Sequence, residues 1–225
     1  MAYGKKSRAG YFPQEEALKI AAVLGSPRPQ GNSSTLAHRF LTTARELGAE
    51  VRVFHLNLMA FQGCQGCGAC KANVEVCIQE DDLTPVLEIV KEADVLVMAS
   101  PVYFGDLSGQ LKCFFDRTYS FFNPDFSSRL PGGKKAVLVL AQANPDAGQY
   151  DDIFPRYQRW LNWFGYERIY LLRAVGVKNP GEIQHQTALL DQAASLAREM
   201  VKYSDCQKFF PIEGVNKITK KLDFW

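Results

Sequence analysis

The sequence carries almost no net charge, because 26 lysines and arginines nearly balance 24 aspartates and glutamates. A formal net charge of +2 lacks the strong positive excess of a nucleic-acid surface, so we expect no nucleic-acid partner. No apolar run approaches the roughly 20 residues that a membrane span needs, so we expect no membrane partner either. The N-terminal segment is basic but has no apolar run behind it, and we therefore expect no secretory signal.

Several common catalytic and nucleotide-binding motifs are missing as well. The chain has no Gly-x-Ser-x-Gly turn, no Walker loop and no Gly-x-Gly-x-x-Gly dinucleotide turn. Neither His38 nor His185 has a cysteine or carboxylate partner at a metal-ligand spacing. These absences exclude the commonest hydrolase and nucleotide-hydrolysing classes and indicate no histidine-based metal site.

Cysteine is too sparse for a secreted disulfide scaffold, with six cysteines in 225 residues. We therefore expect a cytoplasmic protein in a reducing compartment, with Cys113 and Cys206 as ordinary thiols. The length fits one large domain with extensions. Composition predicts an N-terminal arm over residues 1–17, a domain over 18–203 and an aromatic C-terminal tail over 204–225.

Short apolar runs alternate with amphipathic segments along the predicted domain. The runs predict five strands, at residues 18–25, 50–56, 95–100, 136–141 and 168–177. Alternating strands and helices predict the α/β class, with a doubly wound, open parallel sheet covered on both faces. With the strand order 2-1-3-4-5, ligands are expected at the carboxyl ends of the first and third strands, where the order reverses.

The loop after the first strand is rich in hydrogen-bond donors and leads into a helix. Ser26, Asn32, Ser33 and Ser34 supply hydroxyl and amide groups, and Arg28 supplies a charged fork. Because a helix N-terminus offers unpaired N–H groups and the positive end of a dipole, this loop suits a phosphate. The alternative is that Ser and Asn merely cap the helix.

The loop after the third strand, residues 101–108, suits a flat ligand. Tyr103 and Phe104 are aromatic residues in a loop, and Gly105 allows the backbone to approach a ring closely. Ser108 is positioned to cap the next helix. The alternative is that both aromatic rings pack on the edge of the sheet.

Four cysteines, Cys64, Cys67, Cys70 and Cys77, follow the spacing C-x2-C-x2-C-x6-C within the cysteine segment 61–80. The first three have the crowded spacing of cubane iron–sulfur ligands. Structural zinc usually takes two separated pairs, which this spacing does not show. A third interpretation has no metal, with the cysteines as small apolar fillers or as a redox disulfide.

Together these motifs resemble the NADPH-dependent FMN reductase family with the flavodoxin-like fold. The resemblance rests on Gly25-Ser-Pro-Arg-Pro-Gln-Gly-Asn-Ser-Ser-Thr35, on Ser100-Pro-Val-Tyr-Phe-Gly-Asp-Leu-Ser108 and on Asp116-Arg117. The spaced cysteines resemble its iron–sulfur flavoprotein branch, although many cluster-free members share a similar cysteine pattern before a pair like Asp81-Asp82. Ser33 stands where the family commonly has threonine, so the hydroxyl is retained.

The resemblance implies FMN as cofactor and a flavodoxin-like, three-layer fold. By position it implies that the first loop holds the phosphate and that a third loop, residues 142–148, borders the ring. It implies a [4Fe-4S] cluster on the four cysteines, and a homodimer or homotetramer in which the C-terminal tail is an exchanged arm. The residues that would lie along the ribityl chain and ring are Pro101, Val102, Tyr103, Phe104 and Gly105.

These implications lead to one hypothesis and two alternatives. The hypothesis is an iron–sulfur flavoprotein-like oxidoreductase that moves electrons between a ferredoxin-like partner and an acceptor. We assign no catalytic side chain, because the flavin carries the chemistry. The first alternative is a cluster-free NAD(P)H-dependent reductase of FMN or quinones, and the second is a non-catalytic thiol redox sensor. Trp160 and Trp163 fall at a spacing typical of core residues, with Trp163 alternatively at a subunit interface.

Overall fold

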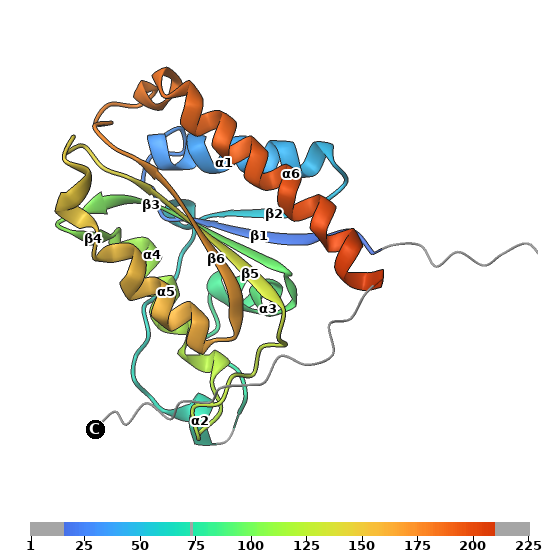
Figure 1. Cartoon of the computed structure of the whole chain (residues 1–225). Helices are drawn as coiled ribbons and strands as arrows, with labels where there is room; N and C mark the ends of the chain where they lie inside the picture. The colour runs from blue at the N-terminus through green and yellow to red at the C-terminus, as the bar shows by residue number, and fades with distance from the viewer. Residues whose placement is uncertain (1–15, 73, 210–225) are drawn as a thin grey trace, which may run out of the picture.

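The computed structural model describes residues 16–72 and 74–209, with backbone only for 203–209. Its sheet has the order β2-β1-β3-β5-β6, and all five of these strands are parallel (Figure 1). This confirms the predicted five strands and their order. A sixth, short strand adds to them, because β4 pairs antiparallel with β3. The strands are β1 (Lys19–Leu24), β2 (Glu50–His55), β3 (Val95–Tyr103), β4 (Asp106–Leu107), β5 (Lys134–Ala141) and β6 (Tyr166–Ala174).

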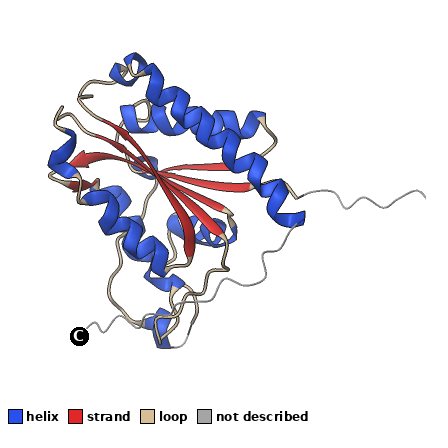
Figure 2. Cartoon of the chain, in the orientation of Figure 1, coloured by secondary structure: helices blue, strands red, loops and turns tan. Residues whose placement is uncertain are grey.

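Helices cover both faces of the sheet, as Figure 2 shows. One hydrophobic core lies under α1 and α6, and a second lies under α3, α4 and α5. The helices are α1 (Asn32–Glu46), α2 (Ala69–Ala72), α3 (Leu83–Glu92), α4 (Gly109–Arg117), α5 (Ile153–Trp163) and α6 (Thr187–Phe209). Single turns of tighter helix are η1 (Leu56–Leu58), η2 (Thr118–Phe121), η3 (Ala147–Tyr150) and η4 (Glu182–His185).

The central strands are buried on both faces, which explains why they read as continuous apolar runs. Every residue of β5 is buried, and so are the first six residues of β3. The outer strands β2 and β6 are only partly buried, because each has a neighbour on one side only. No helix in the described part of the chain is both long and apolar enough to cross a membrane.

Three sequence predictions need correction. Residues 101–108 are not one loop, because β3 continues to Tyr103 and β4 returns at Asp106. Only Phe104 and Gly105 form the turn, with φ angles of 48° and 77°. Such two-residue hairpin turns need positive φ at both positions, and they are usually recognised by Asn-Gly or Asp-Gly. A phenylalanine in the first position hid the hairpin from sequence reasoning.

The other corrections concern the helices near the C-terminus of the domain. The last helix begins at Thr187 rather than at residue 183, because η4 and Gln186 precede it. Trp160 and Trp163 on α5 are not core residues: they are 37% and 40% exposed.

The predicted arm lies outside the described residues except for its last two positions, and the predicted tail lies outside them beyond Phe209.

The start of α4 packs closely against the loop after β1. The Ser108 hydroxyl donates to the Gly25 carbonyl at 2.7 Å and accepts from the Leu111 N–H at 3.3 Å, which confirms Ser108 as the helix cap. Gly25 lies so close to α4 that a β-carbon there would be 2.5 Å from the Leu111 Cβ. Only glycine fits this approach.

We expect Gly25→Ala to lower the free energy of unfolding by about 1–3 kcal/mol, because the added methyl group overpacks the junction. Gly109→Ala is the matched control, since a β-carbon at Gly109 would meet nothing within 4 Å. Urea unfolding of both variants measures the difference. Equal stability of the two variants would contradict the close packing at Gly25.

Candidate functional site

The first cavity, the phosphate-loop cavity, lies at the carboxyl ends of β1, β3 and β5 and has a volume of about 250 Å³. This is the edge at which the strand order reverses, as the sequence predicted. Its lining comes from four segments that are distant in the sequence. The lining residues are Ser26, Arg28, Gly31, Asn32, Ser33, Pro101, Val102, Tyr103, Ala141, Ala143, Val177, Lys178 and Pro180.

The phosphate loop is folded by its own side chains. The Ser26 hydroxyl donates to the Arg28 carbonyl at 2.9 Å and accepts from the Arg28 N–H at 3.1 Å. Helix α1 begins after Gly31, which caps it without a side-chain hydrogen bond. The N–H groups of its first turn therefore remain available for an anion. Among the described residues, the buried hydroxyl of Ser33 in this turn finds no hydrogen-bond partner.

Seven of the ten predicted cofactor residues line this cavity, and three do not. The Ser34 hydroxyl, fully buried, instead faces the Arg28 carbonyl at 3.5 Å. Phe104 stands fully exposed at the tip of the hairpin, with Gly105 beside it. Arg28, the predicted charged fork, is exposed and its guanidinium lies 3.4 Å from the Lys178 carbonyl.

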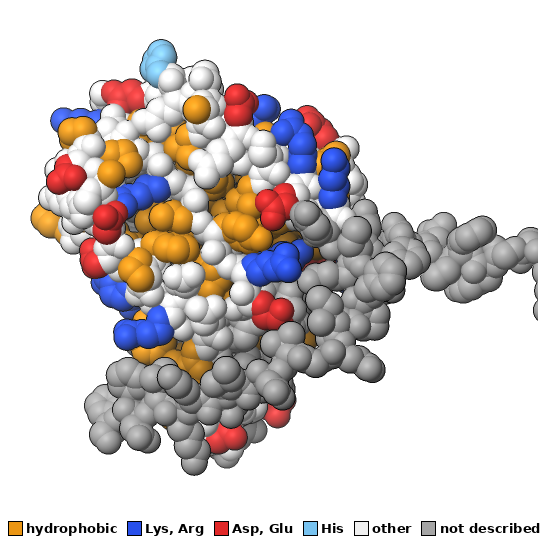
Figure 3. Space-filling model, viewed as in Figure 1, with side chains coloured by type: hydrophobic (Ala, Val, Ile, Leu, Met, Phe, Trp, Pro, Cys, Tyr) orange, Lys and Arg blue, Asp and Glu red, His pale blue; other side chains and the backbone are white. Residues whose placement is uncertain are grey.

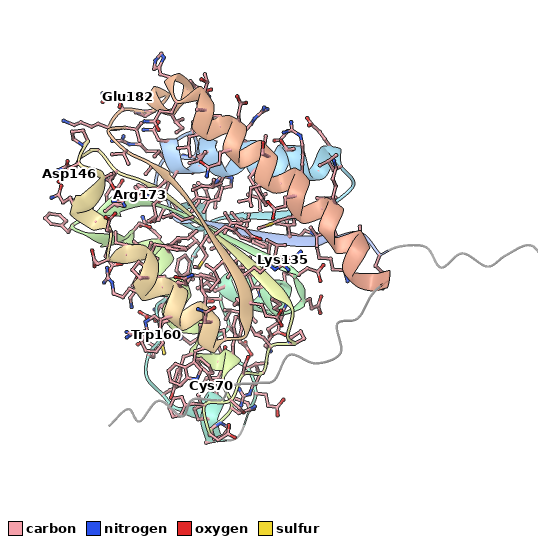
Figure 4. All side chains as sticks on the ribbon, viewed as in Figure 1. Cys70, Lys135, Asp146, Trp160, Arg173 and Glu182 are labelled. Carbon is pink, nitrogen blue, oxygen red and sulfur yellow. The ribbon has the colours of Figure 1, made fainter. Side chains whose placement is uncertain are left out.

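Sequence reasoning missed the loop after β6, which supplies Val177, Lys178 and Pro180. Asn32 binds this loop from the start of α1, donating to the Asn179 carbonyl at 2.9 Å and accepting from the Ile183 N–H at 3.2 Å. The signal was a Gly/Pro-rich segment carrying a lysine directly after a predicted strand. Figure 4 shows the neighbouring Glu182 at the same end of the molecule as Asp146, which belongs to the predicted third loop.

The second site is the cysteine loop, residues 63–79, which is closed at its neck by hydrogen bonds. The Ala60 N–H donates to the Asp82 carboxylate at 2.6 Å, and the Gln62 N–H donates to the Asp81 carboxylate at 3.2 Å. The Arg117 guanidinium, with its side chain completely buried, donates to the same Asp81 carboxylate at 2.7 Å. It also donates to the Gln62 carbonyl at 2.9 Å.

Two further cations join the middle of the cysteine loop to the residues after α4: Arg129 binds the loop, and Lys71 belongs to it. Arg129 donates to the carbonyls of Cys70 and Glu75, both at 3.0 Å. Lys71 donates to the Tyr119 and Phe122 carbonyls, both at 2.6 Å, and its ammonium lies 4.0 Å from the centre of the Tyr119 ring. Burial lowers the pKa of Lys71, whereas the neighbouring sulfurs act in the opposite direction.

The four cysteines line one cavity of about 290 Å³, the cysteine cavity, together with Arg117. Gly66 and Gly68 flank Cys67 with φ angles of 63° and 72°, which only glycine adopts readily, so the chain curls around the cavity. No three of the described His, Cys, Asp and Glu side chains stand together as a metal-binding group. The donor set, four cysteines that line one cavity, nevertheless suits a thiolate-ligated cluster.

A third and larger cavity, the aromatic cavity of about 820 Å³, reaches from Cys64 to Asp106 of β4. Stacked rings of Trp160 and Trp163, 5.5 Å apart, line its α5 side. At its other end the Tyr157 hydroxyl donates to the Asp106 carboxylate at 2.8 Å, and burial and this bond raise the pKa of Tyr157. Figure 4 shows Trp160 between the edge that carries Asp146 and the loop that carries Cys70.

Comparison with known proteins agrees with this geometry. Residues 18–150 match the NADPH-dependent FMN reductase family. The chain belongs to this family. A member named iron-sulfur flavoprotein from Archaeoglobus fulgidus is 38% identical over 167 residues, which are 74% of this chain and 72% of that protein.

Two further similarities concern the sequence and the fold of this FMN reductase family member. An NAD(P)H dehydrogenase (quinone) from Deinococcus radiodurans is 27% identical over 147 residues, 65% of this chain and 70% of that protein. The fold matches the NAD(P)H:quinone oxidoreductase from Methanothermobacter marburgensis with a TM-score of 0.66 at 19% identity, covering 82% and 96% of the two chains. The protein is thus an FMN-dependent oxidoreductase with the flavodoxin-like fold that the sequence predicted.

The neck of the cysteine loop depends on the charge of Asp81. Burial raises the pKa of Asp81, but the hydrogen bonds from Arg117 and from two backbone N–H groups outweigh it and hold the pKa below its usual range. Because the folded-state pKa is depressed, the ionised carboxylate contributes stability above the unfolded pKa of about 4. That contribution is lost as pH falls through the folded-state pKa.

We expect Asp81→Asn to lower the free energy of unfolding at neutral pH by about 3 kcal/mol, because Arg117 stays buried without its counter-charge. Wild type and variant converge as pH falls below about 4. Asp116→Asn is the control, since the Asp116–Lys112 pair is exposed and is worth less than about 1 kcal/mol. A gap between wild type and Asp81→Asn that persists unchanged in acid would show that the charge is irrelevant.

Proposed function

We propose that the protein transfers electrons between a ferredoxin-like partner and an acceptor through FMN and a [4Fe-4S] cluster in the reducing cytoplasm. The cluster ligands are Cys64, Cys67, Cys70 and Cys77. The observation that carries this proposal is that all four cysteines line one cavity whose wall includes the buried Arg117 side chain. Similarity to the iron-sulfur flavoprotein of Archaeoglobus fulgidus supports it.

The phosphate-loop cavity suits FMN. The N–H groups of the first turn of α1 and the hydroxyls of Ser26 and Ser33 bind the phosphate, with Arg28 and Lys178 at the rim. The orphaned Ser33 hydroxyl is a buried donor that the phosphate satisfies. Pro101, Val102 and Tyr103, which line the cavity, would hold the ribityl chain, and Phe104 and Gly105 of the hairpin tip would hold the ring. The Ser34 hydroxyl faces the Arg28 carbonyl of the loop, so Ser34 would bind the phosphate only through its N–H group.

The bound cofactors supply one- and two-electron chemistry, and the protein supplies position and charge. Arg117, inside the wall of the cysteine cavity, offsets the negative charge of thiolate ligands. Backbone N–H groups of the hairpin turn would supply donors to the polar edge of a bound flavin ring. No side-chain acid, base or nucleophile takes part in the proposal.

A homodimer or homotetramer completes this proposal. No described residue lines both the phosphate-loop cavity and the cysteine cavity, and Figure 4 shows Cys70 at the opposite end from Asp146 and Glu182. Partly exposed aromatic rings line the cavity between them, and hydrophobic side chains gather on the face between α5 and α6 (Figure 3). A second copy that covers these surfaces brings its flavin beside the cysteine loop.

A cluster-free NAD(P)H-dependent quinone or flavin reductase is the second candidate. It is favoured by the absence of a ready metal-binding group among the described side chains. The Deinococcus relative, named NAD(P)H dehydrogenase (quinone), points the same way. In that case NAD(P)H replaces ferredoxin as electron donor, and the four cysteines are thiols without a metal.

We expect Ser33→Ala to weaken FMN binding about tenfold while leaving the stability of the FMN-free protein unchanged within about 1 kcal/mol. The reason is that the hydroxyl makes no protein hydrogen bond but reaches a charged ligand. Thr43→Ala is the control, because Thr43 lies on the same helix and its hydroxyl already donates to the Arg39 carbonyl at 3.0 Å. Fluorescence titration with FMN measures both. Unchanged FMN affinity in Ser33→Ala would remove Ser33 from the phosphate site.

The cluster is tested by iron, acid-labile sulfide and flavin analysis of protein purified without oxygen. We expect iron and sulfide beside FMN in wild type, a large loss of both in Cys77→Ser, and wild-type content in Cys113→Ser. Cys113 contacts Gly63 and does not line the cysteine cavity. Flavin without iron or sulfide in wild type would overturn the cluster, and rapid flavin reduction by NAD(P)H in that preparation would establish the second candidate.

A further inference from the structure

Three cations connect the cysteine loop to the rest of the fold. Arg117 and Arg129 lie outside the loop, and Lys71 lies within it. Arg117 from α4 binds the loop where it begins and ends, Arg129 binds its middle, and Lys71 ties α2 down onto η2. We call these three residues the scaffold cations. Arg117 and Arg129 donate to four backbone carbonyls of the loop and its neck: Gln62, Cys70, Glu75 and Gln79.

The scaffold cations are themselves held in place. Arg117 is 1% exposed and forms a two-pronged pair with Asp81, at 2.7 and 3.3 Å. Arg129 also donates to the Ser120 carbonyl and the Asn123 side chain, both at 2.9 Å. A charged donor that several acceptors already fix loses little conformational entropy on binding one more carbonyl. We therefore infer that the arginines fix the conformation of the loop, and not the loop the arginines.

The same cations bring positive charge to the cysteines. Arg117 lines the cysteine cavity, and its Nε is buried without a hydrogen-bond partner among the described residues. The Nε–H group of Arg117 is therefore a donor available to a sulfur. Lys71 is the neighbour of Cys70 and is fixed above the Tyr119 ring. Four thiolates that line one cavity repel one another, so they need such counter-charges and donors, which also raise the reduction potential of a bound cluster.

We propose that Arg117 and Arg129 hold the four cysteines around one cavity before any cluster is inserted, and that Lys71 tunes the potential of the cluster. This inference rests on the proposed function for its second half only. The first half concerns the iron-free chain, because the carbonyl contacts are made by the protein alone.

Amide hydrogen exchange of the iron-free, full-length protein tests the first half. We expect the Lys71 and Val74 amides, which donate to the Gly68 and Ala69 carbonyls, to be protected in wild type. They should exchange about tenfold faster in Arg129→Gln, because the charged hydrogen bonds that hold this part of the loop are lost. Arg198→Gln, on the exposed face of α6, is the matched control and leaves the loop unchanged. An unprotected wild-type loop, or wild-type exchange in Arg129→Gln, overturns the scaffold.

Redox titration of the cluster-loaded protein tests the second half. We expect Lys71→Met to bind as much iron as wild type but to shift the cluster potential downward, with 59 mV corresponding to a tenfold change for one electron. Lys71→Arg restores the potential because it restores the charge, whereas Lys202→Met on α6 leaves it unchanged. A Lys71→Met potential equal to wild type overturns the tuning role.

Failure of the proposed function and failure of the scaffold give different results. If wild type takes up no iron, the proposed function fails and the tuning role of Lys71 fails with it, while hydrogen exchange still decides whether the loop is organised. If wild type takes up a full cluster and both variants behave as wild type, the proposed function stands and the scaffold is wrong.

Discussion

The arrangement around the cysteines depends on one buried ion pair, between Arg117 at the end of α4 and Asp81 before α3. A buried guanidinium tolerates no loss of its acceptors, so the pair fixes every group that shares it. These groups include the Gln62 N–H and both carbonyls that Arg117 binds at the neck. The pair therefore turns an insert after β2 into a loop with a defined beginning and end.

The other end of α4 is fixed just as firmly. Ser108 caps the helix and bonds to Gly25, which begins the phosphate loop. A helix of nine residues is about 13 Å long, so α4 is a short, stiff link between the two sites. Its N-terminus is set by close backbone packing and its C-terminus by charge. The same helix thus aligns the phosphate loop and the cysteine loop on one frame.

The sequence predicted those parts of the fold that follow from local pattern. Continuous apolar runs identified the five main strands, and the first loop identified Ser26 and Ser33 as residues of one cavity. It did not predict the hairpin at Phe104, because a phenylalanine is a poor marker for positive φ. It also did not predict Lys178, whose loop is held at the cavity by tertiary bonds such as those of Asn32. The role of Arg117 was hidden for the same reason, since its partner lies 36 positions away in the sequence.

The separate linings of the phosphate-loop cavity and the cysteine cavity carry an evolutionary consequence. Among the described residues, none lines both cavities, so a substitution at a cysteine removes no residue from the lining of the phosphate-loop cavity. The cysteine loop is a module joined to the flavodoxin-like fold at its neck and through the contacts of Arg129 and Lys71. Such a module can be gained, lost or emptied in a lineage without passing through a non-functional flavoprotein. A single family can then contain members with two redox centres and members with one.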